Sequence, residues 1–247
     1  MSDQKVGIVT GGSSGIGRTT AVALAKEGVK VAVADRRERE GEETVLLVKE
    51  AGADGIFVKT DVVIEDDVKA LVEKTVKMYG RLDYAFNNAG IAETPTPLID
   101  QTSEGFDKIM NVNVKGVWLC MKYEIPEMIQ RGTGAIVNMS SMAGVIGTPQ
   151  IPIYTASKHA VLGLTKSAAQ EYAKSGIRIN AAAPSLVRTD MFGSIDKQYT
   201  EPLKSMHPIG RIAEPEEIAN AVVWLLSDKA SFVLGHTLLV DGGLISR

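Results

Sequence analysis

The chain has 247 residues, of which 45% are hydrophobic and 23% charged, and its formal net charge is −3. These values are typical of a globular protein, and without a long block of like charge they do not favour a nucleic-acid partner. No run approaches the ~18 consecutive apolar residues that a membrane span needs, so we expect no membrane association.

The cysteine, the histidines and the N-terminal residues indicate the expected location of the protein and whether a disulfide or a metal site is expected. Cys120 is the only cysteine, which excludes an internal disulfide and favours a reducing, cytoplasmic location. It stands in the apolar run GVWLCM, where a buried and inert thiol is expected. The N-terminus lacks a basic region followed by a long apolar stretch, so no signal peptide is predicted. His159, His207 and His236 lie far apart without ligand spacing, and no metal site is predicted.

Short runs rich in Val, Ile and Ala alternate with longer helical patterns along the whole chain. The strand-like runs occupy residues 5–10, 30–35, 55–61, 82–90, 134–141, 177–184 and 236–243. Nearly unbroken apolar strands that alternate with helices predict an α/β fold, a doubly wound parallel sheet of the Rossmann type. No Pro- or Gly-rich linker interrupts the pattern, so residues 1–247 are interpreted as a single domain.

The segment from Met191 to about Pro215 does not follow this alternation of strands and helices. Its sequence, MFGSIDKQYTEPLKSMHPIGRIAEP, carries three prolines and has weak periodicity. Long irregular insertions in compact domains are often lids or binding loops, so 191–215 is the predicted substrate lid. The alternative is that this segment is an ordinary surface loop without a role in binding.

A glycine-rich turn, TGGSSGIG, follows the first strand directly and opens a helical pattern. Gly11, Gly15 and Gly17 are spaced so that backbone N–H groups can approach a pyrophosphate at the positive end of the helix. Gly17 would let that helix pack close to the sheet. The turn therefore predicts a dinucleotide site that includes Ser13, Ser14 and Ile16, with a plain tight turn as the alternative.

Asp35 ends the second strand, where a carboxylate would hydrogen-bond a ribose hydroxyl of the adenosine half. A carboxylate there repels a 2′-phosphate, so NAD is favoured over NADP. Arg36 and Arg37 follow immediately, and an arginine could clamp that phosphate instead. Ser14 is neutral where a basic residue would help a phosphate. A turn residue at a strand end is the structural alternative for Asp35.

Two further strand ends carry polar groups at the same edge of the predicted sheet. Asp61, in TDVV, could meet the adenine amino group, and NNAG at 87–90 places asparagines and a glycine where a backbone must approach a flat ligand. Ligands of open α/β sheets bind outside the carboxyl ends of the strands, so these ends are expected to converge on one crevice.

Tyr154 and Lys158 stand four residues apart in YTASKHAVLGLTK, on one face of a predicted helix. An ammonium beside a phenol favours phenolate and would lower its pKa toward the working pH, which makes the tyrosine a general acid or base. Ser140 or Ser141, at the end of the strand AIVNMSS, could hold the substrate oxygen. Asn113 is unfavourable in a helix interior, and it could bind a water that relays protons or satisfy a neighbouring backbone group.

These motifs together resemble the short-chain dehydrogenase/reductase family, in its single-domain branch, over essentially the whole chain. TGGSSGIG, NNAG, VNVKG, IVNMSS and YTASK each match a family motif. The family interval, 154 − 141 = 13, selects Ser141 over Ser140, and VNVKG selects Asn113 over Asn111. The resemblance implies hydride transfer with a catalytic tetrad of Asn113, Ser141, Tyr154 and Lys158.

The resemblance also implies a set of cofactor contacts and a homotetramer. Val187 and Thr189 would touch the carboxamide and pyrophosphate, and Val62 and Asn88 would flank the adenosine half. The complete predicted cofactor site consists of Gly11, Ser13, Ser14, Gly15, Ile16, Gly17, Asp35, Arg36, Asp61, Val62, Asn88, Ala89, Gly90, Tyr154, Lys158, Pro184, Val187 and Thr189.

One position departs from the family pattern, because Ser185 stands where the family usually has a glycine after the sixth strand. Glycine there permits a positive φ or a close approach to the nicotinamide, so serine is expected to affect loop geometry and substrate fit. A looser similarity to enzymes of cyclic secondary alcohols and cyclohexadiene diols accompanies AFNNAG. Residues that would set specificity, or only pack loops, are Ala92, Glu93, Met142, Thr148, Gln150, Ser185, Phe192, Tyr199 and Met206.

The predicted function is therefore an NAD-dependent oxidoreductase acting on a secondary alcohol or ketone. A catalytically silent NAD(P)-binding sensor on the same fold is the alternative, because a fold does not determine a function. An epimerase or dehydratase with tightly held NAD is less compatible with the glycine spacing.

Overall fold

A parallel sheet forms the centre of this computed structural model, which describes residues 4–189 and 204–246. The described strands are β1 (Val6–Thr10), β2 (Lys30–Asp35), β3 (Gly55–Lys59), β4 (Tyr84–Asn87), β5 (Gly134–Met139), β6 (Ile177–Pro184) and β7 (Thr237–Val240). Their order in the sheet is β3-β2-β1-β4-β5-β6-β7, and every neighbouring pair is parallel. The predicted doubly wound α/β sheet is confirmed.

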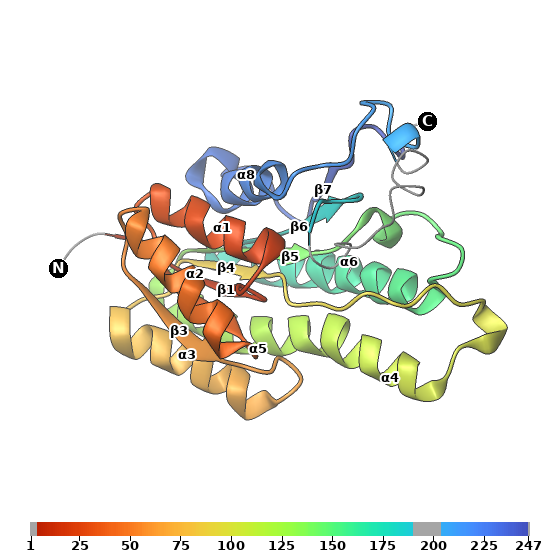
Figure 1. Cartoon of the computed structure of the whole chain (residues 1–247). Helices are drawn as coiled ribbons and strands as arrows, with labels where there is room; N and C mark the ends of the chain where they lie inside the picture. Colours follow the sequence, from red (N-terminus) through yellow and green to blue (C-terminus); the bar gives the residue numbers. More distant parts are fainter. Residues whose placement is uncertain (1–3, 190–203, 247) are drawn as a thin grey trace.

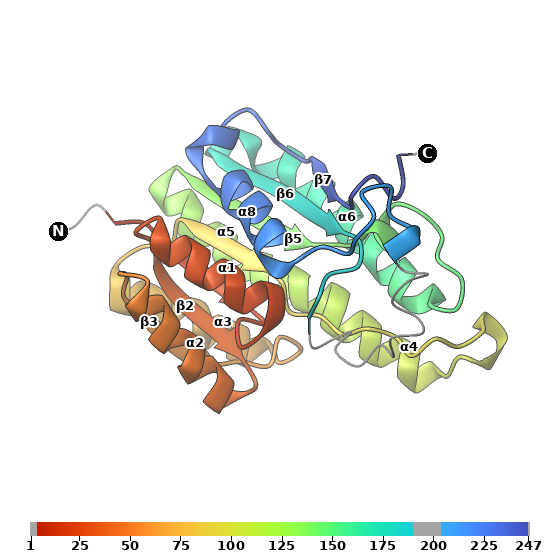
Figure 2. The same ribbon diagram turned by 45° about the horizontal axis from the view of Figure 1, so that its top comes forward.

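Helices cover both faces of this sheet (Figures 1 and 2). The long ones are α1 (Gly15–Lys26), α2 (Glu38–Glu50), α3 (Glu65–Tyr79), α4 (Ser103–Met110), α5 (Gly116–Arg131), α6 (Pro152–Tyr172) and α8 (Pro215–Leu226). Short helical segments occupy η1 (Leu98–Asp100), η2 (Asn111–Lys115), η3 (Met142–Gly144), η4 (Ala173–Ser175) and η6 (Asp228–Ala230).

Two hydrophobic clusters hold the layers together, one on each face of the sheet. Successive strand side chains point to opposite faces, so Val9 of β1 packs with α1, α2 and α8, whereas Ile8 packs with α3, α5 and α6. Because both faces are buried, the strands are apolar throughout rather than alternating. This explains why the sequence shows continuous runs of Val, Ile and Ala.

The strand order places a crevice at the carboxyl end of the sheet. From β1 the chain winds outward through β2 and β3, then crosses to β4 on the other side of β1. Helical connections therefore diverge between β1 and β4, which is where open α/β sheets bind their ligands. The turn after β1 and the NNAG segment after β4 meet at this point.

Strands 30–35 and 177–184 have the predicted bounds, whereas most of the others are shorter than predicted. The run 82–90 forms a strand only over Tyr84–Asn87, and 134–141 only over Gly134–Met139. Beyond the end of β4, the polar residues leave the ladder because several of their hydrogen bonds go to the end of β1 and the turn after it. The Asn88 N–H, for example, donates to the Thr10 hydroxyl rather than only to a strand carbonyl.

The predicted lid at 191–215 can be followed only in its second part, because residues 191–203 lie outside the described residues. Ala213 pairs with Val187 in a parallel bridge. Its carbonyl accepts from the Arg188 N–H at 2.9 Å, and its N–H donates to the Leu186 carbonyl at 3.0 Å. The end of the segment is therefore fastened to the loop that follows β6.

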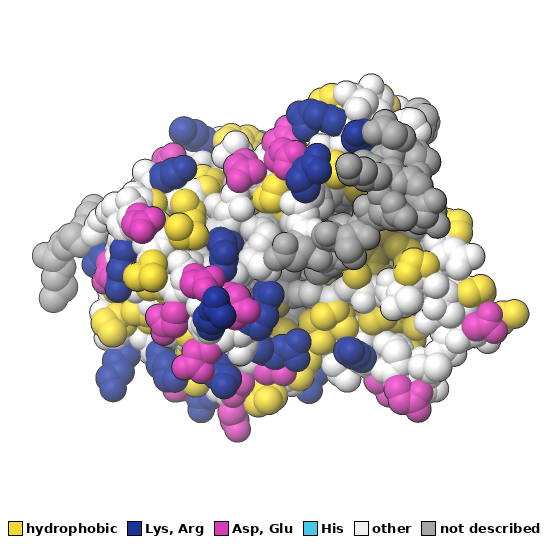
Figure 3. All heavy atoms as spheres, in the orientation of Figure 1, with side chains coloured by type: hydrophobic (Ala, Val, Ile, Leu, Met, Phe, Trp, Pro, Cys, Tyr) yellow, Lys and Arg dark blue, Asp and Glu magenta, His cyan; other side chains and the backbone are white. Residues whose placement is uncertain are grey.

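The surface seen in Figure 3 carries positive and negative side chains interspersed over α1, α2 and α3. None of the helices in the described ranges is long and apolar enough to cross a membrane. Within the same ranges no group of three or more His, Cys, Asp or Glu is arranged to hold a metal ion. Cys120 is buried as predicted, and burial raises its pKa well above the usual value.

Candidate active site

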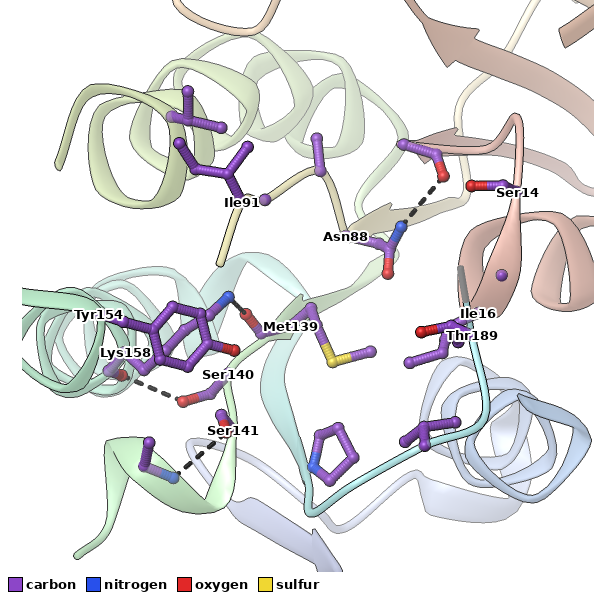
Figure 4. A pocket seen from close by; sticks show the side chains of 18 of the residues that line it. Ser14, Ile16, Asn88, Ile91, Met139, Ser140, Ser141, Tyr154, Lys158 and Thr189 are labelled. Carbon is purple, nitrogen blue, oxygen red and sulfur yellow. Dashed lines mark hydrogen bonds between the residues drawn. The ribbon is translucent and has the colours of Figure 1, made fainter. Parts of the chain in front are cut away.

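A cavity of about 540 Å³ lies at the carboxyl ends of the strands. Most of the predicted cofactor and catalytic residues line it, and Figure 4 shows Tyr154, Lys158 and Ser141 on one side with Ser14, Ile16 and Thr189 on the other. The predicted residues in its wall are Gly11, Ser14, Gly15, Ile16, Asp35, Arg36, Asp61, Val62, Asn88, Ala89, Gly90, Ser141, Tyr154, Lys158, Pro184, Val187 and Thr189.

Three predicted residues, Ser13, Gly17 and Asn113, lie behind this wall. Other lining residues were not predicted, namely Ala34, Thr60, Ile91, Val112, Met139, Ala143, Ile151, Leu186 and Leu244. Most of them adjoin a predicted residue along the chain, so proximity to a strand end was the available signal. Leu244 had no such signal, because only the fold brings the C-terminal turn to the cavity.

The glycine turn has the geometry that a phosphate cradle requires. Gly11 has a φ of +64°, which favours glycine. A side chain on Gly17 would bring its Cβ within 2.2 Å of the Gly11 carbonyl oxygen, so only glycine lets α1 begin this close to β1. Among the described residues no side chain caps the first turn of α1. Its N–H groups therefore remain available to an anion at the positive end of the helix.

Asp35 is held as a carboxylate at the end of β2. Its Oδ2 accepts from the Ser13 N–H at 3.3 Å, and its Oδ1 accepts from the Arg37 N–H at 3.0 Å. Partial burial acts to raise the pKa of Asp35, but the hydrogen bonds from Arg37 and Ser13 outweigh it and leave that pKa below its usual value.

The two arginines after β2 have different partners. Arg37 donates to the Ser14 hydroxyl at 2.8 Å and pairs with Asp35 at 3.4 Å. Arg36, which was predicted as the cofactor contact, reaches Asp61 at 3.7 Å. Arg37 is thus the arginine tied to the glycine turn, and both guanidinium groups already face carboxylates.

Asn88 fastens the end of β4 to the turn after β1. Its side-chain amide donates to the carbonyls of Thr10 and Gly11 at 3.0 and 3.2 Å. The Thr10 hydroxyl accepts in turn from the N–H groups of Asn88 and Ala89. These contacts fix the glycine turn relative to the NNAG segment, so the two parts of the cavity wall keep fixed positions relative to each other.

The two candidate serines have different environments. The Ser140 hydroxyl donates to the Lys158 carbonyl at 3.0 Å, which makes it an anchor between β5 and α6. The Ser141 hydroxyl accepts from the Ala143 N–H at 3.2 Å and interacts with the Tyr154 phenol. The geometry therefore favours Ser141 as the serine that shares a substrate oxygen with the tyrosine.

Tyr154 and Lys158 meet as predicted, but their titration differs from the prediction. The Lys158 Nζ lies 5.5 Å from the centroid of the Tyr154 ring and donates to the Met139 carbonyl at 2.9 Å. Burial raises the pKa of Tyr154, and the interaction with Ser141 lowers it only in part. Burial also lowers the pKa of Lys158 to about 8. The prediction that the neighbouring ammonium lowers the pKa of the phenol is therefore wrong in direction for this structure, because desolvation of the ring outweighs the hydrogen bond with Ser141.

Asn113 lies in η2, a π-helical turn between α4 and α5, rather than in an ordinary helix. Its side chain accepts from the Ile91 N–H at 2.8 Å, and donates to the Ile91 carbonyl at 3.0 Å and the Ser157 hydroxyl at 3.1 Å. Ser157 donates to the Tyr154 carbonyl at 2.7 Å. The second sequence alternative, a side chain that satisfies a neighbouring backbone, is thus present, and the proton relay stays a prediction.

The predicted specificity residues fall into three groups. Met142, Thr148, Ser185 and Met206 line the cavity. Ala92, Glu93 and Gln150 lie outside its wall, although Glu93 accepts a hydrogen bond from the Tyr154 N–H at 2.7 Å. Phe192 and Tyr199 lie outside the described residues.

The residues present fit a nicotinamide dinucleotide. The uncapped first turn of α1 suits a pyrophosphate, the ionised Asp35 suits a ribose diol, and the cavity continues from there to Tyr154. A buried phenol beside a buried lysine at the far end of such a cradle matches the predicted class, a hydride-transferring oxidoreductase.

Comparison with known proteins agrees with this class. A family model described as enoyl-(acyl carrier protein) reductase matches residues 11–245. A 2,5-dichloro-2,5-cyclohexadiene-1,4-diol dehydrogenase from Sphingobium indicum is 50% identical over 98% of each chain. A cyclohexanol dehydrogenase from an Acinetobacter species is 42% identical over 99% of this chain and 96% of the other. The crystal structure of levodione reductase superposes with a TM-score of 0.93, at 37% identity over 97% of this chain and 96% of the other.

The chain therefore belongs to the short-chain dehydrogenase/reductase family. The predictions of the family, of the Rossmann-type fold and of an NAD(P)-dependent enzyme are confirmed. Membership implies a nicotinamide cofactor without deciding between NAD and NADP. The homotetramer stays a prediction.

Proposed function

We propose that the protein is an NAD-dependent dehydrogenase of cyclic secondary alcohols, with Tyr154 as the group that exchanges a proton with the substrate oxygen. The observation that carries the proposal is that Tyr154, Ser141 and Lys158 line the same cavity as the glycine turn and Asp35. The relatives named as dehydrogenases of six-membered ring alcohols support the substrate class.

Each residue has a role that follows from its position. Ser141 and the Tyr154 hydroxyl would hold the alcohol oxygen between them, and the phenol would take the proton as the hydride leaves. The buried Lys158 would stabilise negative charge that develops on the phenol. Asn113 would keep Ile91 and Ser157 in place behind the tyrosine. A nicotinamide dinucleotide, when bound, supplies the ring carbon that accepts the hydride.

Replacing Tyr154 with phenylalanine tests the proton transfer. Tyr154→Phe removes one hydroxyl from a buried ring, so we expect turnover to fall by about 10³-fold or more, while NAD affinity stays within a few-fold. Turnover is measured by NADH absorbance over a panel of cyclic alcohols, and affinity by cofactor titration. Comparable activity in the variant would remove Tyr154 from its role. Cofactor binding without turnover of any alcohol by the native protein would favour the sensor alternative.

Asp35 supports the preference for NAD, because an ionised carboxylate at this strand end repels a 2′-phosphate. Arg37, the arginine nearest to Ser14, is already paired with that carboxylate. Asp35→Ala would leave Arg37 free to bind a phosphate, so we expect the ratio of kcat/KM for NAD over NADP to fall by about tenfold or more. Glu38→Ala, which removes an exposed carboxylate nearby, is the matched control. An unchanged ratio in Asp35→Ala would exclude Asp35 from cofactor selection.

A further inference from the structure

Ser185 occupies the position after β6 without backbone strain. Among the described residues Gln150 is the one non-glycine residue with a positive φ, so Ser185 has an ordinary backbone conformation. Its N–H donates to the Val240 carbonyl at 3.4 Å, which joins the loop to the last strand. The conformational freedom of a glycine is therefore not required here, and the serine side chain needs its own explanation.

The Ser185 hydroxyl has a buried partner from the segment that precedes α8. The Ser185 Oγ lies 2.9 Å from Nε2 of His207, and the His207 side chain is 3% exposed. The Gly210 N–H donates to the His207 carbonyl within a turn, and the Ile209 N–H donates to the Gly242 carbonyl, which joins this segment to the C-terminal turn. The imidazole thus holds the serine hydroxyl in one place.

Ser185 also borders the cavity, together with an otherwise apolar group of side chains. Leu186, Val187, Met206 and Leu244 line the cavity as well. The reacting oxygen is expected at Ser141 and Tyr154, which come from the end of β5 and from α6 instead. A half-buried hydroxyl among apolar lining residues, on a different strand end from Ser141, provides one polar contact for a second group on the substrate.

The hydroxyl retains hydrogen-bonding capacity after it pairs with the histidine. A serine hydroxyl has one donor and two acceptor sites, and His207 uses one of them. If the imidazole donates, the serine proton is left for a substrate oxygen; if it accepts, the serine lone pairs are left for a substrate hydroxyl. In both tautomers Ser185 can bind an alcohol oxygen.

We propose that Ser185 is a specificity-determining residue that hydrogen-bonds a second oxygen on a cyclic alcohol, with His207 as its positioning residue. The preferred substrates are then ring diols or hydroxy ketones rather than simple cyclic alcohols. This inference rests on the proposed function, since it names the substrate class of the same site.

The test compares kcat/KM for cyclohexanol with kcat/KM for the cyclohexane-1,2-, 1,3- and 1,4-diols. We expect Ser185→Ala and Ser185→Gly to lower the ratio of the best diol to cyclohexanol by about tenfold, the worth of one hydrogen bond in a desolvated site. Ser185→Thr keeps the hydroxyl and is expected to retain most of the ratio. His207→Phe removes the partner and should lower the ratio in the same direction. Ser167→Ala, on the exposed face of α6, is the control.

The possible results distinguish a failure of the Ser185 contact from a failure of the proposed dehydrogenase function. If the native enzyme oxidises cyclohexanol but the ratio is unchanged in Ser185→Ala and Ser185→Gly, the contact is absent and only this inference fails. Equal losses for cyclohexanol and diols would indicate a purely structural serine, and would overturn it as well. No turnover of any of these alcohols by the native enzyme, with either cofactor, would overturn the proposed function and the inference together.

Discussion

Lys158 is a buried cation whose position costs stability. Burial lowers its pKa from the usual 10.5 to about 8, and its Nζ bonds only one described backbone carbonyl, that of Met139. A shift of this size corresponds to about 3 kcal/mol against the charged form. Lys158→Met removes that charge and loses one hydrogen bond, so we expect turnover to be abolished while the free energy of unfolding at pH 7 rises by about 1–2 kcal/mol.

The pH dependence of the stability gained in Lys158→Met tests whether the buried charge of Lys158 causes it. Because the folded pKa lies below the unfolded one, the cost is fully present below pH 8 and is relieved as the pH rises from about 8 toward 10.5. Urea denaturation of both proteins between pH 6 and pH 10 should show the advantage of Lys158→Met shrinking over that range. Lys166→Met, at an exposed position on the same helix, should change little. A less stable Lys158→Met at pH 7 would contradict the burial argument.

The sequence predicted which candidate residues meet at the cavity, but it did not predict how folding changes the pKa of Tyr154. The motif interval of the short-chain dehydrogenase/reductase family favoured Ser141 over Ser140, and the four-residue spacing placed Tyr154 and Lys158 on one face of a helix. The direction of the phenol pKa was wrong, because desolvation depends on how much of the fold covers the ring. The contacts of Asn113 were equally inaccessible, since Ile91 and Ser157 approach it only through the π-helical turn.

The first turn of α6 is held by the segment that follows β4. Glu93 is 9% exposed, and its carboxylate accepts from the Tyr154 N–H at 2.7 Å, one of the orphan donors at the start of the helix. Nearby, the Thr96 N–H donates to the Gln150 carbonyl at 2.7 Å, and Gln150 has a φ of +71°. These two bonds fasten the beginning of the helix that carries the tyrosine.

Glu93 is therefore expected to position Tyr154 through its backbone. Glu93→Ala removes the acceptor for a buried N–H, so kcat should fall about tenfold or more, with a smaller change in cofactor affinity. Glu93→Gln retains an acceptor oxygen and should recover kcat to within about threefold. Steady-state kinetics of both variants, with the exposed Glu104→Gln as control, checks this. Equal losses in Glu93→Ala and Glu93→Gln would show that charge, and not the hydrogen bond, is what the site needs.

The bounds of β2 and β6 were predicted, whereas β4 ends at Asn87 instead of continuing to residue 90 as predicted. The run KVAVAD has the predicted bounds because Asp35 still pairs with Lys59 of β3. The run after Asn87 looks equally extended in sequence, but its polar groups bond the glycine turn instead. At the end of β4, contacts with the glycine turn thus override the extended local pattern.

At the scale of the whole molecule, a polar cluster interrupts the apolar layer between the sheet and the helices α5 and α6. The Asn87 side chain donates to Glu124 and to Asn138, each at 3.0 Å, and Asn138 donates to the Thr165 hydroxyl. All four side chains are buried. Burial raises the pKa of Glu124 to about 7, although its hydrogen bond with Asn87 acts against this. The stability of the protein is therefore tied to a proton on Glu124.

Glu124→Gln should make stability less sensitive to pH. The folded pKa of about 7 lies above the unfolded value of 4.5, so the native protein loses about 3 kcal/mol as the pH rises from 4.5 through 7. Glutamine has the same shape, cannot ionise, and keeps a side-chain oxygen that can accept the hydrogen bond from Asn87. We expect the variant to be more stable than the native protein by about 2–3 kcal/mol at pH 8 and by little at pH 4.5, as measured by urea denaturation. Glu127→Gln, on a partly exposed position of α5, is the control, and a Glu124→Gln advantage that does not grow with pH would exclude an ionising Glu124 as the source.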